Sequence, residues 1–82
     1  MNEYKNEYPK FIVKVKDFGP VQENIDEYQD WTGVFYKTDI DAVENHMAVH
    51  FPVSQYKEFT FGVFTKESVN DIWAFVKCIN PK

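Results

Sequence analysis

The sequence contains neither leucine nor arginine. Because leucine is missing, the core has to be built from phenylalanine, valine, isoleucine, tryptophan and tyrosine, which favour strands over helices. Aromatic residues make up 18% of the chain, and each buried ring removes a large apolar area from water. Because arginine is missing, no guanidinium group is present for bidentate recognition of phosphate or carboxylate. The composition therefore predicts a strand-rich fold without an arginine-based phosphate site.

Cysteine occurs once, at Cys78, which excludes an internal disulfide and a cysteine-based zinc site and fits a reducing compartment. The first eight residues lack the apolar centre of a signal peptide, and no apolar run is as long as a membrane span. Eighty-two residues suffice for one modest core. We therefore expect a cytoplasmic protein, in the host cytoplasm if a phage encodes it, without membrane attachment. It would have a flexible polar tail at 1–9 and a single α+β domain at 10–82.

Three strands are expected, at residues 10–17, 31–37 and 57–65, because apolar and polar residues alternate or apolar residues run together there. Residues 21–30 allow either a short helix or an irregular acidic loop, since apolar residues fall at helical spacing within a polar segment.

Two helices are expected, one after the second strand and one after the third, because each segment opens with a capping pattern and continues with apolar residues at a period of 3.6. The first helix would open at 38–41 and the second at 65–68, with Asn80 and Pro81 ending the second. The inner stripe of the first helix would be Ile40, Val43, Met47 and Phe51. The inner stripe of the second would be Val69, Ile72, Trp73, Val76 and Ile79, with Trp73 in the core.

These elements predict an α+β fold in which a small three- to four-stranded, mostly antiparallel sheet carries two helices on one face. The element order would be strand, loop or short helix, strand, helix, strand, helix. The uncovered face of the sheet would carry Ile12, Lys14, Lys16, Val34, Tyr36, Thr60 and Phe64.

Groups that could support catalysis or metal binding are sparse. His46 and His50 stand four residues apart on the first expected helix, with His50 nearer the apolar boundary, but Met47 occupies the position where an HExxH motif has its glutamate. Cys78 has no adjacent base in the sequence, and the three glycines form no phosphate-binding loop. We therefore expect no catalytic residue, no metal and no cofactor, and a protein that is not an enzyme.

The segment Lys57-Glu58-Phe59-Thr60-Phe61-Gly62-Val63-Phe64 resembles the aromatic skeleton of the first ribonucleoprotein motif of RNA-recognition-motif domains, although Glu58 stands where the motif has glycine. The resemblance implies that Phe59 and Phe61 stack on bases, with Phe11 in the partner motif. It offers an alternative function, single-stranded RNA binding through the sheet. The residues that would carry it are Phe11, Lys57, Phe59, Phe61 and Phe64.

The middle of the chain is strongly acidic. Residues 17–56 contain eight acidic residues against one lysine, within a chain whose net charge is −4. Such a segment attracts basic partners and repels phosphates, so a nucleic acid is the less favoured partner. Exposed tyrosine and tryptophan beside charge are typical anchors of interfaces, although an acidic turn with both rings at the core edge would explain the same residues. The expected partner-binding residues are Glu23, Asp26, Glu27, Tyr28, Asp30, Trp31, Asp39, Asp41 and Glu44.

The sequence therefore favours a small non-enzymatic module that docks this acidic and aromatic surface onto a basic site of another protein. In size, acidity and polar tail it is similar to small bacteriophage proteins that inhibit host or defence factors. A protein that functions as a homo-oligomer stays open as a further class.

Overall fold

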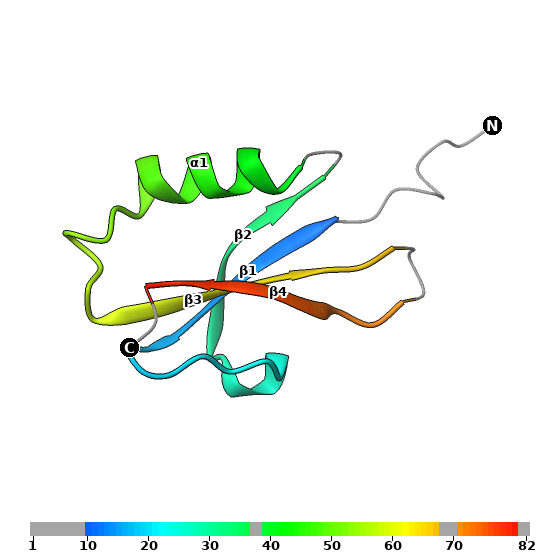
Figure 1. The fold of residues 1–82 in the computed structure, drawn as a ribbon, viewed down its shortest axis with the longest axis horizontal. Coiled ribbons are helices and arrows are strands. Elements are labelled where there is room, and N and C mark those ends of the chain that lie inside the picture. Colours follow the sequence, from blue (N-terminus) through cyan, green and yellow to red (C-terminus); the bar gives the residue numbers. More distant parts are fainter. Residues whose placement is uncertain (1–9, 37–38, 68–70, 81–82) are drawn as a thin grey trace.

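A computed structural model of the chain describes residues 10–36, 39–67 and 71–80. Within these residues the elements are β1 (Phe11–Asp17), the 3-10 turn η2 (Ile25–Glu27), β2 (Asp30–Phe35), α1 (Ile40–His50), β3 (Phe59–Thr65) and β4 (Ala74–Ile79). The strands form one antiparallel sheet in the order β2-β1-β3-β4, so β2 and β4 are its edges (Figure 1).

One face of the sheet is covered by α1 and holds the main core (Figure 1). Val13 of β1 and Val63 of β3 are paired and fully buried, and Val43 and Met47 of α1 belong to the same cluster. Each of these residues lies on the apolar side of its element, as the sequence periodicity requires. The remaining members of the core and its margin are Phe11, Phe61, Val15, Phe35, Ile40, Phe51, Tyr56 and Ile79.

The start of α1 is set by Asp39, whose carboxylate accepts a hydrogen bond from the backbone N–H of Ala42 at 2.9 Å. This carboxylate satisfies one of the donors that the first turn leaves free. The sequence predicted Thr38 in the capping position, and Thr38 lies outside the described residues. The helix itself, with Val43 and Met47 facing inward, is where the sequence predicted it.

The opposite face, which we call the second face, is covered at one end by residues 18–29, which include η2 (Figure 1). Tyr28 packs its ring edge-on against Phe64, with 5.4 Å between ring centroids. The Thr60 hydroxyl accepts the backbone N–H of Gly19 at 3.3 Å and donates to the Asn80 carbonyl at 2.9 Å. Thr60 and Phe64 are therefore fully buried, and their predicted place on an uncovered face is wrong.

The predicted fold with two helices on one face is wrong, because the described chain has one α-helix and one 3-10 turn. Residues 74–79 of the segment expected to form the second helix are instead the edge strand β4, paired with β3. Valine, phenylalanine and isoleucine favour strands, and β4 satisfies the edge of β3 that would otherwise lack hydrogen bonds. Ser68 and Val69 of the expected helix, and Pro81 at its end, lie outside the described residues.

The residues of the expected helical stripe consequently lack a common buried side. Ile72 is 85% exposed, and Val76 is the residue that the register shift in the β3–β4 pairing leaves unpaired. Trp73 is only half-buried, with the Lys66 ammonium 4.6 Å from its ring centroid, so its predicted place in the core is wrong. No helix among the described residues has the length and apolar character needed to cross a bilayer.

Candidate protein-interaction surface

The turn η2 is built by a short-range hydrogen bond that leaves its carboxylates facing water. The side-chain oxygen of Asn24 accepts the backbone N–H of Asp26 at 2.9 Å, which is the usual role of asparagine at the start of a helical turn. The two acidic residues of the turn, Asp26 and Glu27, are exposed, and so is Glu23 before it. The acidic segment is therefore ordered by hydrogen bonds from its backbone N–H groups to Asn24 and Ile25, and not by ion pairs.

Trp31 lies next to this segment, at the start of the edge strand β2, and 57% of its surface is exposed. It pairs with Lys14, which in turn pairs with Gly62, the residue beneath the Tyr28 ring. Directly paired residues point to the same side of a sheet. Trp31 therefore projects on the second face, the face that residues 18–29 partly cover.

Four carboxylates and one exposed indole thus come from residues 23–31, at the β2 end of this segment, although Asp30 pairs with Val15 and so leaves β2 on the side opposite to Trp31. We call this group the acidic-aromatic surface; it consists of Glu23, Asp26, Glu27, Asp30 and Trp31. None of these four carboxylates forms an ion pair with another residue in the part of the chain that the structure describes. The charge of the surface is therefore left for an external partner or for solvent.

The other predicted acids lie elsewhere. Asp39 and Asp41 are exposed at the start of α1, beyond the opposite end of β2, about 16 Å of strand away from Asp30. Glu44 faces β4 across the helix-covered side and forms an ion pair with Lys77, with 3.0 Å between Oε2 and Nζ. The fold therefore divides the predicted partner-binding acids into three places, and the first contains Trp31, the exposed tryptophan.

Tyr28, predicted as a partner contact, is an internal anchor. Only 5% of it is exposed, and its hydroxyl donates to the Gln22 carbonyl at 2.7 Å while lying 3.2 Å from Cys78 Sγ. Burial, and then the contact with Cys78, raise the pKa of the Tyr28 phenol well above its ordinary value, because both disfavour the phenolate. Tyr28 thus holds residues 18–29 against the sheet and has little surface to offer a partner.

The aromatic residues that resemble an RNA-binding motif are mostly buried. Phe11 and Phe61 lie under α1, and Phe64 lies under Tyr28, so none of the three has a ring face open to a base. Lys57 is exposed. Phe59 is 36% exposed at the rim of an apolar hollow that Val15, Phe51, Tyr56 and Phe61 also line.

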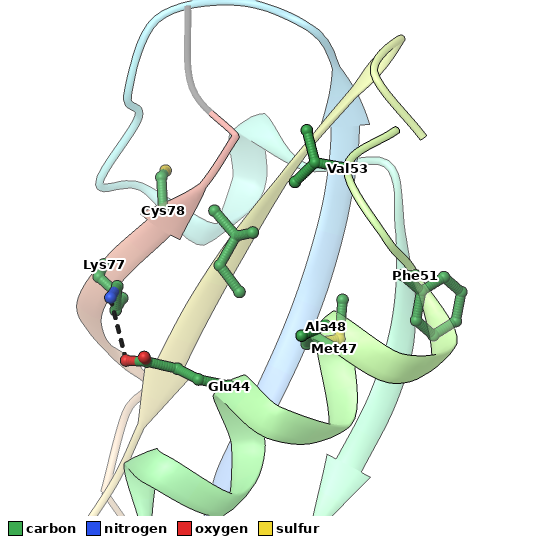
Figure 2. Close-up of a pocket in the computed structure, with 8 residues that line it drawn as sticks. Glu44, Met47, Ala48, Phe51, Val53, Lys77 and Cys78 are labelled. Carbon is green, nitrogen blue, oxygen red and sulfur yellow. Dashed lines mark hydrogen bonds and ion pairs between the residues drawn. The ribbon is translucent and has the colours of Figure 1, made fainter. Parts of the chain in front are cut away.

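A groove of about 260 Å³ separates α1 from the edge strand β4 (Figure 2). Its apolar lining comes from Met47, Ala48, Phe51, Val53 and Ile79. The ion pair between Glu44 and Lys77 spans one end of it, as the dashed line in Figure 2 shows. Both charged groups are substantially exposed, so this pair orients two side chains and adds little stability.

The two histidines contact each other on α1 with their rings tilted by 36° and 4.4 Å between ring centroids. His46 is half-buried with its ring edge-on to Phe35, whereas His50 is exposed, which reverses the order expected from the sequence. The described residues contain no group of three or more histidine, cysteine, aspartate or glutamate side chains arranged to hold a metal ion. That the protein binds no metal stays a prediction.

Some structurally important residues carried no signal in the sequence. The contact between Tyr28 and Cys78 joins residues fifty positions apart, and Cys78 falls within the segment that was expected to form the second helix. Asn80, with a φ of 62°, donates from its side-chain amide to the Phe59 carbonyl at 2.8 Å. Its position before Pro81 predicted the end of a helix, and asparagine tolerates a positive φ better than most residues.

Comparison of the chain with models of protein families, with curated proteins and with solved structures finds no match in any of the three.

Proposed function

We propose that this protein binds another protein, and that the acidic-aromatic surface docks onto a basic site of that partner. One observation carries the proposal: exposed carboxylates without a cationic partner among the described residues stand beside Trp31, which is largely exposed. Unpaired surface charges of one sign speed the encounter with a partner of opposite sign. A tryptophan next to them supplies the apolar anchor that a charged rim lacks.

A basic site on another protein is commonly a site for nucleic acid, because such sites neutralise phosphates with lysine and arginine. A small acidic protein that occupies such a site competes with the nucleic acid and so inhibits the protein to which it is bound. Competition of this kind is the action we propose for this protein, by analogy with small bacteriophage inhibitors. The RNA-binding alternative has no comparable support, because three of the rings it requires are buried.

The test is a pull-down from bacterial lysate followed by mass spectrometry, with three forms of the protein as bait. The first is the wild type, and the second carries lysine in place of Asp26, Glu27 and Asp30. The third is a matched control with the same change in net charge at exposed acids elsewhere, namely Asp41→Lys, Glu58→Lys and Asp71→Lys.

We expect the wild type and the matched control to retain the same basic protein, with binding that weakens as salt is added. The variant with the reversed acidic-aromatic surface should lose that protein. Equal loss in both variants would show that net charge alone attracts the partner, and equal retention would show that the interface lies elsewhere. Either result contradicts the proposal.

A further inference from the structure

The strands of the sheet separate charge by face, which the net charge of −4 conceals. Within the described strands, the charged side chains on the second face are those of Lys14 and Lys16, because Lys14 pairs with Trp31 and Lys16 follows two residues later. Asp17 and Asp30 are each one residue out of phase with these positions and point to the other side. The strands therefore present positive charge on the second face of an acidic protein.

Residues 18–29 cover only one end of this face, and no other described element lies over the rest, which we call the open part (Figure 1). Lys16 belongs to the covered end, where its ammonium donates to the carbonyl of the next residue at 3.2 Å. Lys10 and Lys66 lie at the opposite end, where the Lys66 N–H donates to the Lys10 carbonyl at 3.3 Å and continues the pairing of β1 with β3. With Lys14 between the two ends, the open part has three lysines.

These three lysines have no anionic partner among the described residues, since none of them forms an ion pair there. The Lys66 ammonium lies 4.6 Å from the ring centroid of Trp73, which holds it beside the start of β4. The surface between the lysines is apolar, because Ile12 and Val34 pair across β1 and β2 and are only half-buried. Such a surface suits an anionic ligand that also has apolar area to cover.

Two aromatic rings on this face have much of their surface open. Tyr36 comes two residues after Val34, so alternation places it on the same side, and it is 52% exposed. Trp31 lies beside Lys14 and is 57% exposed. Neither ring belongs to the segment that resembles a ribonucleoprotein motif. Open rings beside lysines are the components with which proteins bind single-stranded nucleic acid, because bases stack on the rings and ammonium groups neutralise the phosphates.

We propose that the open part of the second face binds a single strand of nucleic acid, with its phosphates at the three lysines and its bases stacked on Tyr36 and Trp31. An acidic peptide would also satisfy the lysines, but a nucleic acid strand brings a flat ring with every charge. A duplex keeps its bases stacked inside and away from such rings. This site goes beyond the proposed function and does not depend on it, because it requires none of the carboxylates of the acidic-aromatic surface.

The affinity should be low, because carboxylates flank the open part at both ends. Glu67 and Asp71 line a hollow with Lys66 just beyond the end of the sheet, and η2 carries its acids at the other end. Each phosphate neutralised on a single strand contributes about −0.7 to the slope of log K against log salt concentration, so three lysines predict a slope of about −2. Binding should therefore be measurable only at low ionic strength.

The test is fluorescence anisotropy of labelled oligothymidylate and oligouridylate, each about 15 nucleotides long, titrated with the full chain to about 0.5 mM at salt concentrations from about 20 mM upward. Lys14→Gln with Lys66→Gln removes two charges from the open part. Lys57→Gln with Lys77→Gln removes the same number from exposed lysines elsewhere and is the matched control. Tyr36→Ala removes a ring and keeps every charge. Circular dichroism confirms that each variant is folded.

We expect the wild type and the matched control to bind at least one of the two oligonucleotides, with a salt slope of about −2. Lys14→Gln with Lys66→Gln should reduce the slope to about −0.7 and weaken binding at least about tenfold at the lowest salt concentration. Tyr36→Ala should weaken binding at least about fivefold and leave the slope unchanged, because base stacking is not ionic.

A wild type that binds neither oligonucleotide at the lowest salt concentration overturns the proposal. Equal weakening in the two lysine variants also overturns it, because net charge and not the open part would then govern binding. Poly-glutamate is the competitor that separates charge from stacking. If it displaces the oligonucleotide at equal concentration of charge, or if Tyr36→Ala binds as well as the wild type, the face recognises charge alone and the nucleic acid is not its ligand.

Discussion

Replacing Gly62 by alanine tests how the second face of the sheet is closed. An alanine Cβ at this position would lie 2.5 Å from Cζ of Tyr28 and 2.7 Å from its Cε2 and Oη, which is closer than two such atoms can approach. The ring cannot turn aside easily, because it is buried against Phe64 and its hydroxyl is bonded to the Gln22 carbonyl. Gly62→Ala therefore has to displace the ring and loosen residues 18–29.

The expected loss in the free energy of unfolding of Gly62→Ala follows from the contacts that the displaced Tyr28 ring gives up. The hydrogen bond to Gln22 contributes about 1 kcal/mol, and forcing an extra methyl group into a packed site costs about 1 to 3 kcal/mol. Alanine recovers about 0.5 kcal/mol over glycine in a strand. The free energy of unfolding should fall by about 2 kcal/mol, a large share of the stability of a domain of this size.

Urea unfolding followed by circular dichroism measures this loss, and a double-mutant cycle assigns it to Tyr28. Tyr28→Ala alone should cost about 3 to 5 kcal/mol, so the cycle is run in a stabilising osmolyte. In the Tyr28→Ala background, Gly62→Ala should change stability by less than about 0.5 kcal/mol, because the clashing ring is gone. Gly19→Ala is the control, since the one tight contact of its Cβ would be with the ammonium end of the flexible Lys16 side chain, at 3.1 Å. If the losses from Gly62→Ala and Tyr28→Ala simply add, Tyr28 does not close the second face.

Three further predictions concern single side chains. The pKa of the Tyr28 phenol is raised in the folded state, so the contribution of Tyr28 to stability is complete below the ordinary tyrosine pKa of about 10 and is lost as the pH rises above that value. A tyrosinate absorbance titration should show one phenol that ionises only on unfolding, and Tyr28→Phe should remove that late step. Lys77→Met should change the free energy of unfolding by less than about 0.5 kcal/mol in urea, because its ion pair with Glu44 is exposed, and a loss above about 1 kcal/mol would show a buried role. Trp31→Ala should leave the melting temperature nearly unchanged but weaken binding of the captured partner by about 2 kcal/mol. In single-tryptophan variants a soluble quencher should reach Trp31 more readily than Trp73, and equal protection of both indoles would contradict the anchor role of Trp31.

The local pattern of the sequence determined β1, α1 and the acidic character of residues 23–30. Alternation over residues 10–17 predicts a strand because successive side chains of a strand point to opposite faces. The spacing of Val43 and Met47 and the acids of the first turn predict α1, because both depend on residues within one or two turns of each other. The exposure of Asp26 and Glu27 follows in the same way, since isolated carboxylates are rarely buried.

Only the tertiary structure decided that residues 74–79 form a strand, and only it decided the shape of the binding surface. Apolar residues recurring at a period of 3.6 suit a helix, but β3 offered an unpaired edge, and a short helix gains too little by itself to compete with that pairing. The division of the acidic run also depends on the tertiary structure, because β2 carries Asp39 and Asp41 away from Asp30, and β4 pairs Glu44 with Lys77. Tyr28 became an anchor because Gly62 and Cys78, far along the chain, form the site into which its ring fits. Contacts between residues so distant in sequence leave no periodic signal, because their geometry exists only once the sheet has formed.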